Sequence, residues 1–84
     1  MDIREVFARN LRRYRRAARL SQEELAHRSE IDRTYISSLE RSVNAASIDV
    51  VDRLATALDL QAADLLIQPS TSRARKARNV ANER

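Results

Sequence analysis

The residues best suited to chemistry in this chain lie in the segment DRTYISSLE, which begins at Asp32. A helix that buries Ile36 and Leu39 would turn four hydrogen-bonding side chains outward: Arg33, Thr34, Ser37 and Ser38. An arginine can bind O6 and N7 of one guanine, and a threonine offers a hydroxyl and a methyl group. This helix surface therefore suits the edges of base pairs in the major groove of DNA.

A second short helix precedes this one and must hold it in place. The segment SQEE, which begins at Ser21, forms a capping box in which the serine accepts from a free N–H and Glu24 reaches back to the cap. This helix ends near Ser29, and the next begins after the N-cap Asp32 and ends near Arg41. Two short helices joined by a short turn are the organisation of a helix-turn-helix.

Three further helices are predicted around this pair. They run from Asp2 to Ala18, from Ser47 to Leu58 and from Gln61 to Ile67. The apolar positions expected to face inward are, in the first, Ile3, Phe7, Leu11, Tyr14 and Ala18, and in the second, Ile48, Val51, Leu54, Ala55 and Leu58. Glycine is absent and proline occurs once, which favours helices over tight hairpins. The predicted fold class is therefore all-α, with five helices.

Charge divides the chain into three parts. Residues 1–19 carry seven arginines against two carboxylates (+5), and residues 20–68 carry four arginines against nine carboxylates (−5). Residues 69–84 carry five basic residues against one carboxylate (+4) and include almost no large apolar residue, so we expect a disordered basic tail after a domain at 1–68. The net charge of +4 is thus that of the tail.

Composition excludes several kinds of function. The chain has no cysteine and only one histidine, His27, so it offers no disulfide framework, no metal cluster and no arrangement for catalysis. We expect no enzyme activity and no cofactor. No apolar run approaches the ~20 residues that a membrane helix needs. We therefore expect a cytoplasmic, nucleoid-associated protein.

The sequence also resembles a known family. The segments LSQEELAHRSEIDRTYISSLER, SIDVVDRLATALDL and ADLL are similar to the Xre family of phage-repressor-type regulators, which have five-helix DNA-binding domains. The match covers about residues 5–67. The segment IDRTYIS is particularly similar to the controller proteins of restriction–modification systems, which are homodimeric transcription regulators.

The resemblance implies a role for individual residues. Arg33, Thr34 and Ser38 match base-reading positions, and Tyr35 matches a residue used for backbone or base contact. Gln22 matches a glutamine that binds a phosphate and braces the recognition helix. Arg15 and Glu40 match an ion pair between the first and third helices. In the loop after the third helix the chain departs from the family, because Asn44 replaces an arginine that contacts a phosphate or a base.

Two positions depart from the family pattern in a way that affects the backbone. Glu30 and Ser42 stand where the family usually has glycine, in the turn and after the third helix. A left-handed backbone costs a residue other than glycine ~1–2 kcal/mol. Either the turn geometry differs here or the core tolerates the strain.

The resemblance further implies a homodimer on an inverted-repeat operator, with control of its own promoter. The interface would be formed by the apolar residues near the last helix: Leu60, Leu65, Leu66 and Ile67. Alternatively, these residues only close the monomer core. RNA polymerase or a regulatory protein are further possible partners. A rival hypothesis is an antitoxin-like module whose basic tail binds another protein, and a third is nonspecific nucleoid binding through the arginines.

Overall fold

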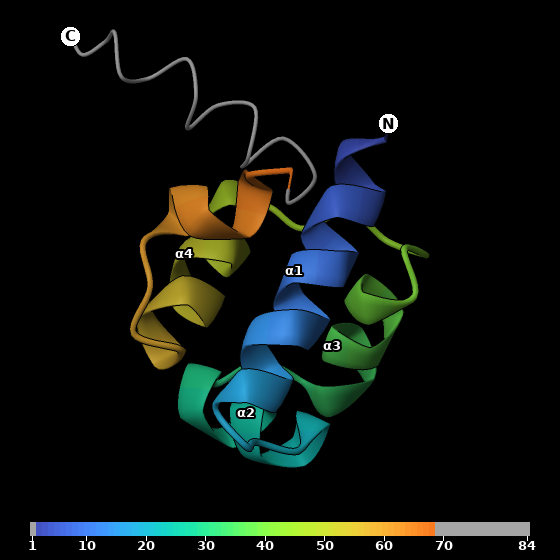
Figure 1. The fold of residues 1–84 in the computed structure, drawn as a ribbon. Helices are drawn as coiled ribbons and strands as arrows, with labels where there is room; N and C mark the ends of the chain where they lie inside the picture. Colours follow the sequence, from blue (N-terminus) through green and yellow to red (C-terminus); the bar gives the residue numbers. More distant parts are fainter. Residues whose placement is uncertain (1, 69–84) are drawn as a thin grey trace, which may run out of the picture.

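The computed structural model describes residues 2–68, and the predicted tail at 69–84 lies outside them. Four α-helices and a short 3-10 helix follow in order (Figure 1): α1 Ile3–Ala17, α2 Gln22–Ser29, α3 Arg33–Glu40, α4 Ile48–Ala57 and η1 Ala62–Leu66. Across residues 2–68 there is no strand, which confirms the all-α prediction. None of these helices is long and apolar enough to cross a membrane.

Each α-helix begins directly after a capping residue, and these residues stand where the sequence placed the helix starts. Asp2, Ser21, Asp32 and Ser47 accept a hydrogen bond from a backbone N–H of the first turn, at 3.0–3.2 Å. In the capping box of α2, the backbone N–H of Ser21 also donates to Glu24 at 2.8 Å. This hydrogen bond lowers the pKa of the Glu24 carboxyl group.

The fifth element is not the α-helix that we predicted. Residues Ala62–Leu66 form a 3-10 helix, held by a backbone bond from Asp64 to the Gln61 carbonyl at 2.9 Å. The Asp64 carboxylate in turn accepts from the Gln61 N–H at 2.9 Å. Five residues supply few i to i−4 bonds, so the tighter i to i−3 pattern prevails in so short an element.

Four helices and η1 enclose one core, in which α1 contacts both α3 and η1, and α2 contacts α3 and α4. Its fully buried apolar side chains come from every element: Leu11, Leu25, Ile36, Leu39, Leu54 and Leu65. Three residues predicted to face this core are exposed instead, and one of them is Ala18, the C-cap residue of α1. Ile3 is 56% exposed and Ile48 is 84% exposed, because each begins its helix at the edge of the domain.

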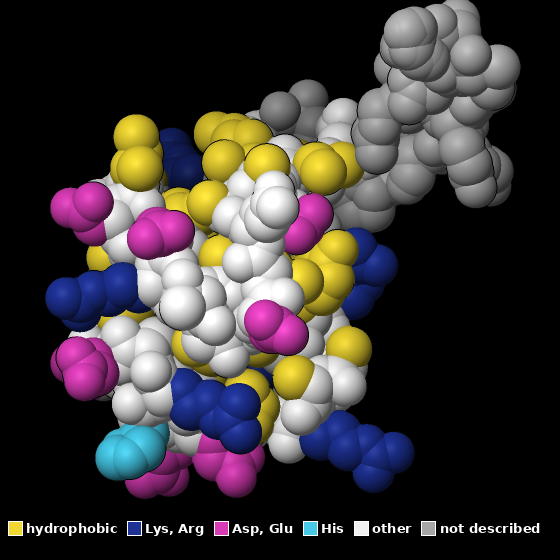
Figure 2. Space-filling model, turned by 90° about the vertical axis from the view of Figure 1, so that its left-hand side faces the viewer, with side chains coloured by type: hydrophobic (Ala, Val, Ile, Leu, Met, Phe, Trp, Pro, Cys, Tyr) yellow, Lys and Arg dark blue, Asp and Glu magenta, His cyan; other side chains and the backbone are white. Residues whose placement is uncertain are grey.

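Five large apolar residues of the described chain are exposed, and three of them, all except Ile3 and Val43, belong to α4 and to the end of η1. Figure 1 places the first turn of α4 beside η1, and these two elements are in contact. Ile48 is the first residue of α4, Leu66 (42% exposed) is the last residue of η1, and Ile67 (38% exposed) follows it. Figure 2 shows hydrophobic side chains gathered at this upper end of the α4 face. We name Ile48, Leu66 and Ile67 the apolar end patch.

The helices are terminated by left-handed residues, none of which is glycine. Positive φ angles of 60–62° occur at Arg19, Glu30, Ser42 and Asp59. The residue after each of them donates its N–H to the carbonyl five positions earlier, at 2.8–3.1 Å, as in a Schellman motif. Glu30 and Ser42 therefore adopt the conformation that glycine would favour, and the structure accommodates the cost.

Replacing Glu30 with glycine should stabilise the protein. Relief of the left-handed strain is worth ~1–2 kcal/mol, and the greater freedom of glycine in the unfolded chain offsets ~0.4–1 kcal/mol of it. We expect Glu30→Gly to raise the free energy of unfolding in urea by about 0.5–1 kcal/mol. Glu30→Ala, which also removes the carboxylate but keeps Cβ, should give no such gain; an equal gain in both variants would contradict a backbone origin.

Candidate DNA-binding face

The two central helices form a helix-turn-helix. The turn from α2 to α3 passes through Glu30 and the buried Ile31, and the two helices pack against each other. Ile36 and Leu39 of α3 are 0% exposed, which fixes the orientation of that helix. Its opposite face is open to solvent.

The predicted base-reading side chains lie on this outer face of α3. Arg33 and Thr34 are exposed, whereas Ser37 and Ser38 are partly buried. The hydroxyl of Ser38 donates to the Thr34 carbonyl at 3.1 Å, so its oxygen remains available as an acceptor. The helix thus presents one cation and several hydrogen-bonding groups along its first two turns.

Tyr35 ties α3 to the loop that follows it. Its ring packs against the core, and its hydroxyl donates to the Ala45 carbonyl at 3.2 Å. The same loop carries Asn44, whose side chain is exposed. Tyr35 therefore positions the loop next to α3, in addition to any contact that it makes itself.

Arg41, which immediately follows α3, was not among the residues predicted to bind DNA. It is exposed, and its Nε donates to the Ser37 carbonyl at 3.3 Å, so the side chain lies back along the helix. Arg33, Ser37 and Arg41 are spaced by four residues and therefore share one face. That spacing was the signal in the sequence that could have identified Arg41.

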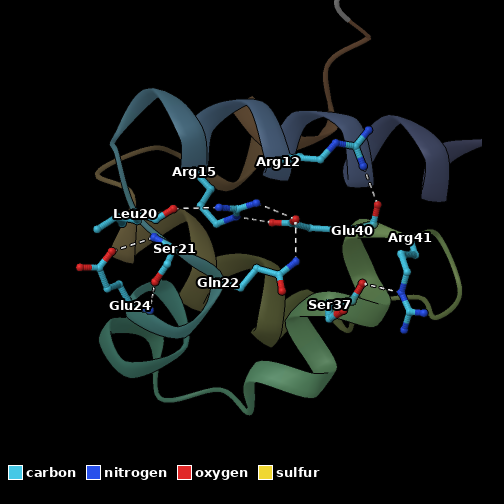
Figure 3. A network of polar contacts seen from close by, with 9 residues as sticks. All are labelled: Arg12, Arg15, Leu20, Ser21, Gln22, Glu24, Ser37, Glu40 and Arg41. Atoms are coloured by element: carbon cyan, nitrogen blue, oxygen red, sulfur yellow. Dashed lines mark hydrogen bonds and ion pairs between the residues drawn. The ribbon is translucent and has the colours of Figure 1, made fainter.

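A buried carboxylate joins α3 to the first two helices (Figure 3). Glu40 accepts from Arg15 through both oxygens, at 2.6 and 3.0 Å, and the two side chains are only 4% and 11% exposed. Arg15 also donates to the Leu20 carbonyl at 2.8 Å. The hydrogen bond to Glu40 raises the pKa of Arg15 above its ordinary value despite burial.

Two further side chains bind the same end of α3. Gln22 donates its amide to Oε1 of Glu40 at 3.1 Å, and Arg12 donates to the Glu40 backbone carbonyl at 2.8 Å. Gln22 therefore braces α3 from the first position of α2. Arg12 satisfies a carbonyl that the end of the helix would otherwise leave unpaired.

The residues predicted for a dimer interface separate into two groups. Leu65 is 0% exposed and Leu60 is partly buried, and both contribute to the monomer core. Leu65 therefore closes the core and does not form part of an interface surface. Leu66 and Ile67 remain exposed and lie in the apolar end patch.

These features define a small helix-turn-helix DNA-binding domain, and residues 11–65 match the helix-turn-helix family. The chain is 44% identical over 66 residues to control protein C.SmaI from Serratia marcescens, with 79% of each chain covered. It superposes on the restriction–modification controller protein C.AhdI from Aeromonas hydrophila with a TM-score of 0.72 at 40% identity, covering 74% of this chain and 94% of that one. A hypothetical transcription factor from Neisseria, NHTF, gives a TM-score of 0.83 at 37% identity, covering 87% and 84%.

The chain belongs to the Xre-like helix-turn-helix family of DNA-binding transcription regulators. Its relatives include controller proteins of restriction–modification systems, as the resemblance implied.

Arg15 should be important for stability only as long as a carboxylate is buried at position 40. Removing one partner of such a pair costs ~3–5 kcal/mol. We therefore expect Arg15→Met to lower the free energy of unfolding in urea by about that amount, and Arg15→Met with Glu40→Leu to recover most of it. Arg16→Met removes the same charge from an exposed neighbour and should change stability by less than about 0.5 kcal/mol. A double variant as unstable as Arg15→Met would contradict this account.

Proposed function

We propose that this protein is a homodimeric transcription regulator that binds an inverted-repeat operator through α3 of each subunit. The observation that supports this most directly is the rigid outer face of α3. Arg33 and Thr34 are exposed on it and Ser37 and Ser38 are partly exposed, while the far end of the helix is held by Arg12, Arg15 and Gln22 through Glu40. Such a helix can enter the major groove without reorganisation of its position.

On this proposal, the first turn of α3 reads bases. Arg33 would bind a guanine through two hydrogen bonds, and Thr34 would contact a thymine methyl or a phosphate. Ser37 and Ser38 lie one turn further along α3, and their short side chains would make hydrogen bonds to DNA groups close to the helix. Because these four side chains project from a single helix face, they would address neighbouring base pairs.

Other residues would fix the helix on the sugar–phosphate backbone. A glutamine amide has two N–H groups, so Gln22 can donate one to Glu40 and one to a phosphate. Tyr35 is bonded to the loop after α3 and Asn44 lies in that loop, and both would contact the sugar–phosphate backbone there. Arg41, at the end of the same face as Arg33, would add a phosphate contact.

Self-association would occur through the apolar end patch. One recognition helix contacts only a few base pairs, and a two-fold dimer would place two of them about 34 Å apart on one side of the DNA. The exposed Ile48, Leu66 and Ile67 provide an apolar surface that a second copy can cover. An operator occupied by such a dimer responds steeply to protein concentration, which suits a regulator of its own promoter.

Selection of bound duplexes from a random DNA pool tests this proposal. The full chain should enrich an inverted repeat whose half-sites are about 10 base pairs apart, or a multiple of a helical turn, because the dimer is two-fold symmetric. Enrichment of a single half-site would contradict the dimer. Uniform binding of all duplexes, with a steep salt dependence, would contradict sequence-specific regulation.

Arg33 and Arg41 should behave differently on the selected operator. Arg33→Ala should cost about 1–3 kcal/mol of binding free energy and relax the preference at one position of each half-site, because a guanine contact is lost. Arg41→Ala should weaken binding to all sequences alike and reduce the salt slope by about 1. The measurement is binding to the operator and its single-base variants over a series of salt concentrations. Identical behaviour of the two variants would refute the assigned roles.

A further inference from the structure

Asn10 of α1 makes two hydrogen bonds whose role the DNA-binding face does not explain. Its side chain is 0% exposed, and its amide nitrogen donates to the carbonyls of Leu65 at 2.9 Å and Ile67 at 2.8 Å. The amide oxygen is buried and has no hydrogen-bond partner among the described residues. The reverse orientation of the amide would face this oxygen toward two carbonyl oxygens, so the two bonds fix the orientation.

The position is one where an apolar residue would avoid the unpaired oxygen. Asn10 lies on the same face of α1 as the buried Phe7 and Leu11, beside the core. A buried acceptor without a partner destabilises the folded state. The two hydrogen bonds to the carbonyls of Leu65 and Ile67 are an interaction that a leucine at position 10 could not make.

These bonds hold the backbone on either side of Leu66. The 3-10 helix comprises five residues and ends at Leu66, and the backbone becomes extended at the next residue, Ile67. The carbonyls at this end point out of the last turn and need donors from elsewhere. Because Asn10 binds the carbonyls immediately before Leu66 and of the residue after it, it determines the direction in which the Leu66 side chain projects.

We infer that Asn10 is a positioning residue for self-association: its buried amide holds Leu66 and Ile67 in the arrangement that a second copy of the chain contacts. This inference rests on the proposed homodimer. Asn10 itself is fully buried and contacts no partner. Its effect is transmitted through the two carbonyls to the apolar end patch.

The test compares variants of the full chain for dimerisation, stability and local order. Asn10→Leu removes both donors while filling the site, and Asn10→Ala serves if the leucine prevents folding. Leu66→Ser disrupts the patch directly, and Ile36→Val weakens the core at a residue of α3, outside η1. The dimer dissociation constant is measured by sedimentation equilibrium, unfolding by urea titration, and amide hydrogen exchange at Leu66, Ile67 and Gln68 by NMR.

We expect Asn10→Leu to raise the dimer dissociation constant at least tenfold and to accelerate amide exchange at these three positions. Ile36→Val should change the dissociation constant less than twofold. An unchanged constant in Asn10→Leu, with a weakened dimer in Leu66→Ser, would overturn the inference and leave the homodimer intact. If Ile36→Val weakened the dimer as much as Asn10→Leu does, Asn10 would act only through the overall stability of the fold, and the inference would be overturned. A monomeric wild-type protein would refute the proposed homodimer and this inference with it.

Discussion

The burial of one carboxylate organises the DNA-binding half of the molecule. Glu40 lies at the end of α3 with a side chain that is 4% exposed, and a charge so placed must be paired. Its partners come from different helices: Arg15 from α1 and Gln22 from α2. The pairing requirement therefore sets α3 relative to the two elements before it, and the outward face of α3 follows from that arrangement.

The helix ends show how a chain without glycine forms a domain this compact. Four left-handed residues reverse the backbone at Arg19, Glu30, Ser42 and Asp59. Each is followed by an aliphatic residue, and after the first two this residue is buried: Leu20 is 9% exposed and Ile31 is 8% exposed. Burial of that residue offsets the unfavourable backbone before it. The result is short connections that leave little freedom in the placement of α3.

Local sequence signals and the family resemblance were sufficient to predict much of this architecture. A cap such as Ser21 acts on the next three residues, so the sequence alone locates the start of α2. The exposure of Ile48 could not be predicted from the sequence. A helical period shows which residues share a face, but it does not show which turns of that face are covered by another element. Arg41 lay at the end of the predicted helix but was given no role there, although its spacing from Arg33 and Ser37 places it on their face. The role of Asn10 could not be predicted, because its partners are more than 50 residues away.

The last element shows why a run of apolar residues was ambiguous in the sequence. A 3-10 helix has about three residues per turn, so consecutive side chains diverge by about 120° and cannot all point the same way. Leu65 enters the core while Leu66 remains outside. The alternative in which these residues close the monomer core therefore applies to Leu65, whereas for the exposed Leu66 and Ile67 the interface stays a prediction. The buried Leu65 and the exposed Leu66 and Ile67 share one short stretch of backbone. The hydrogen bonds from Asn10 that hold this backbone to α1 therefore also affect where Leu66 and Ile67 lie in the apolar end patch.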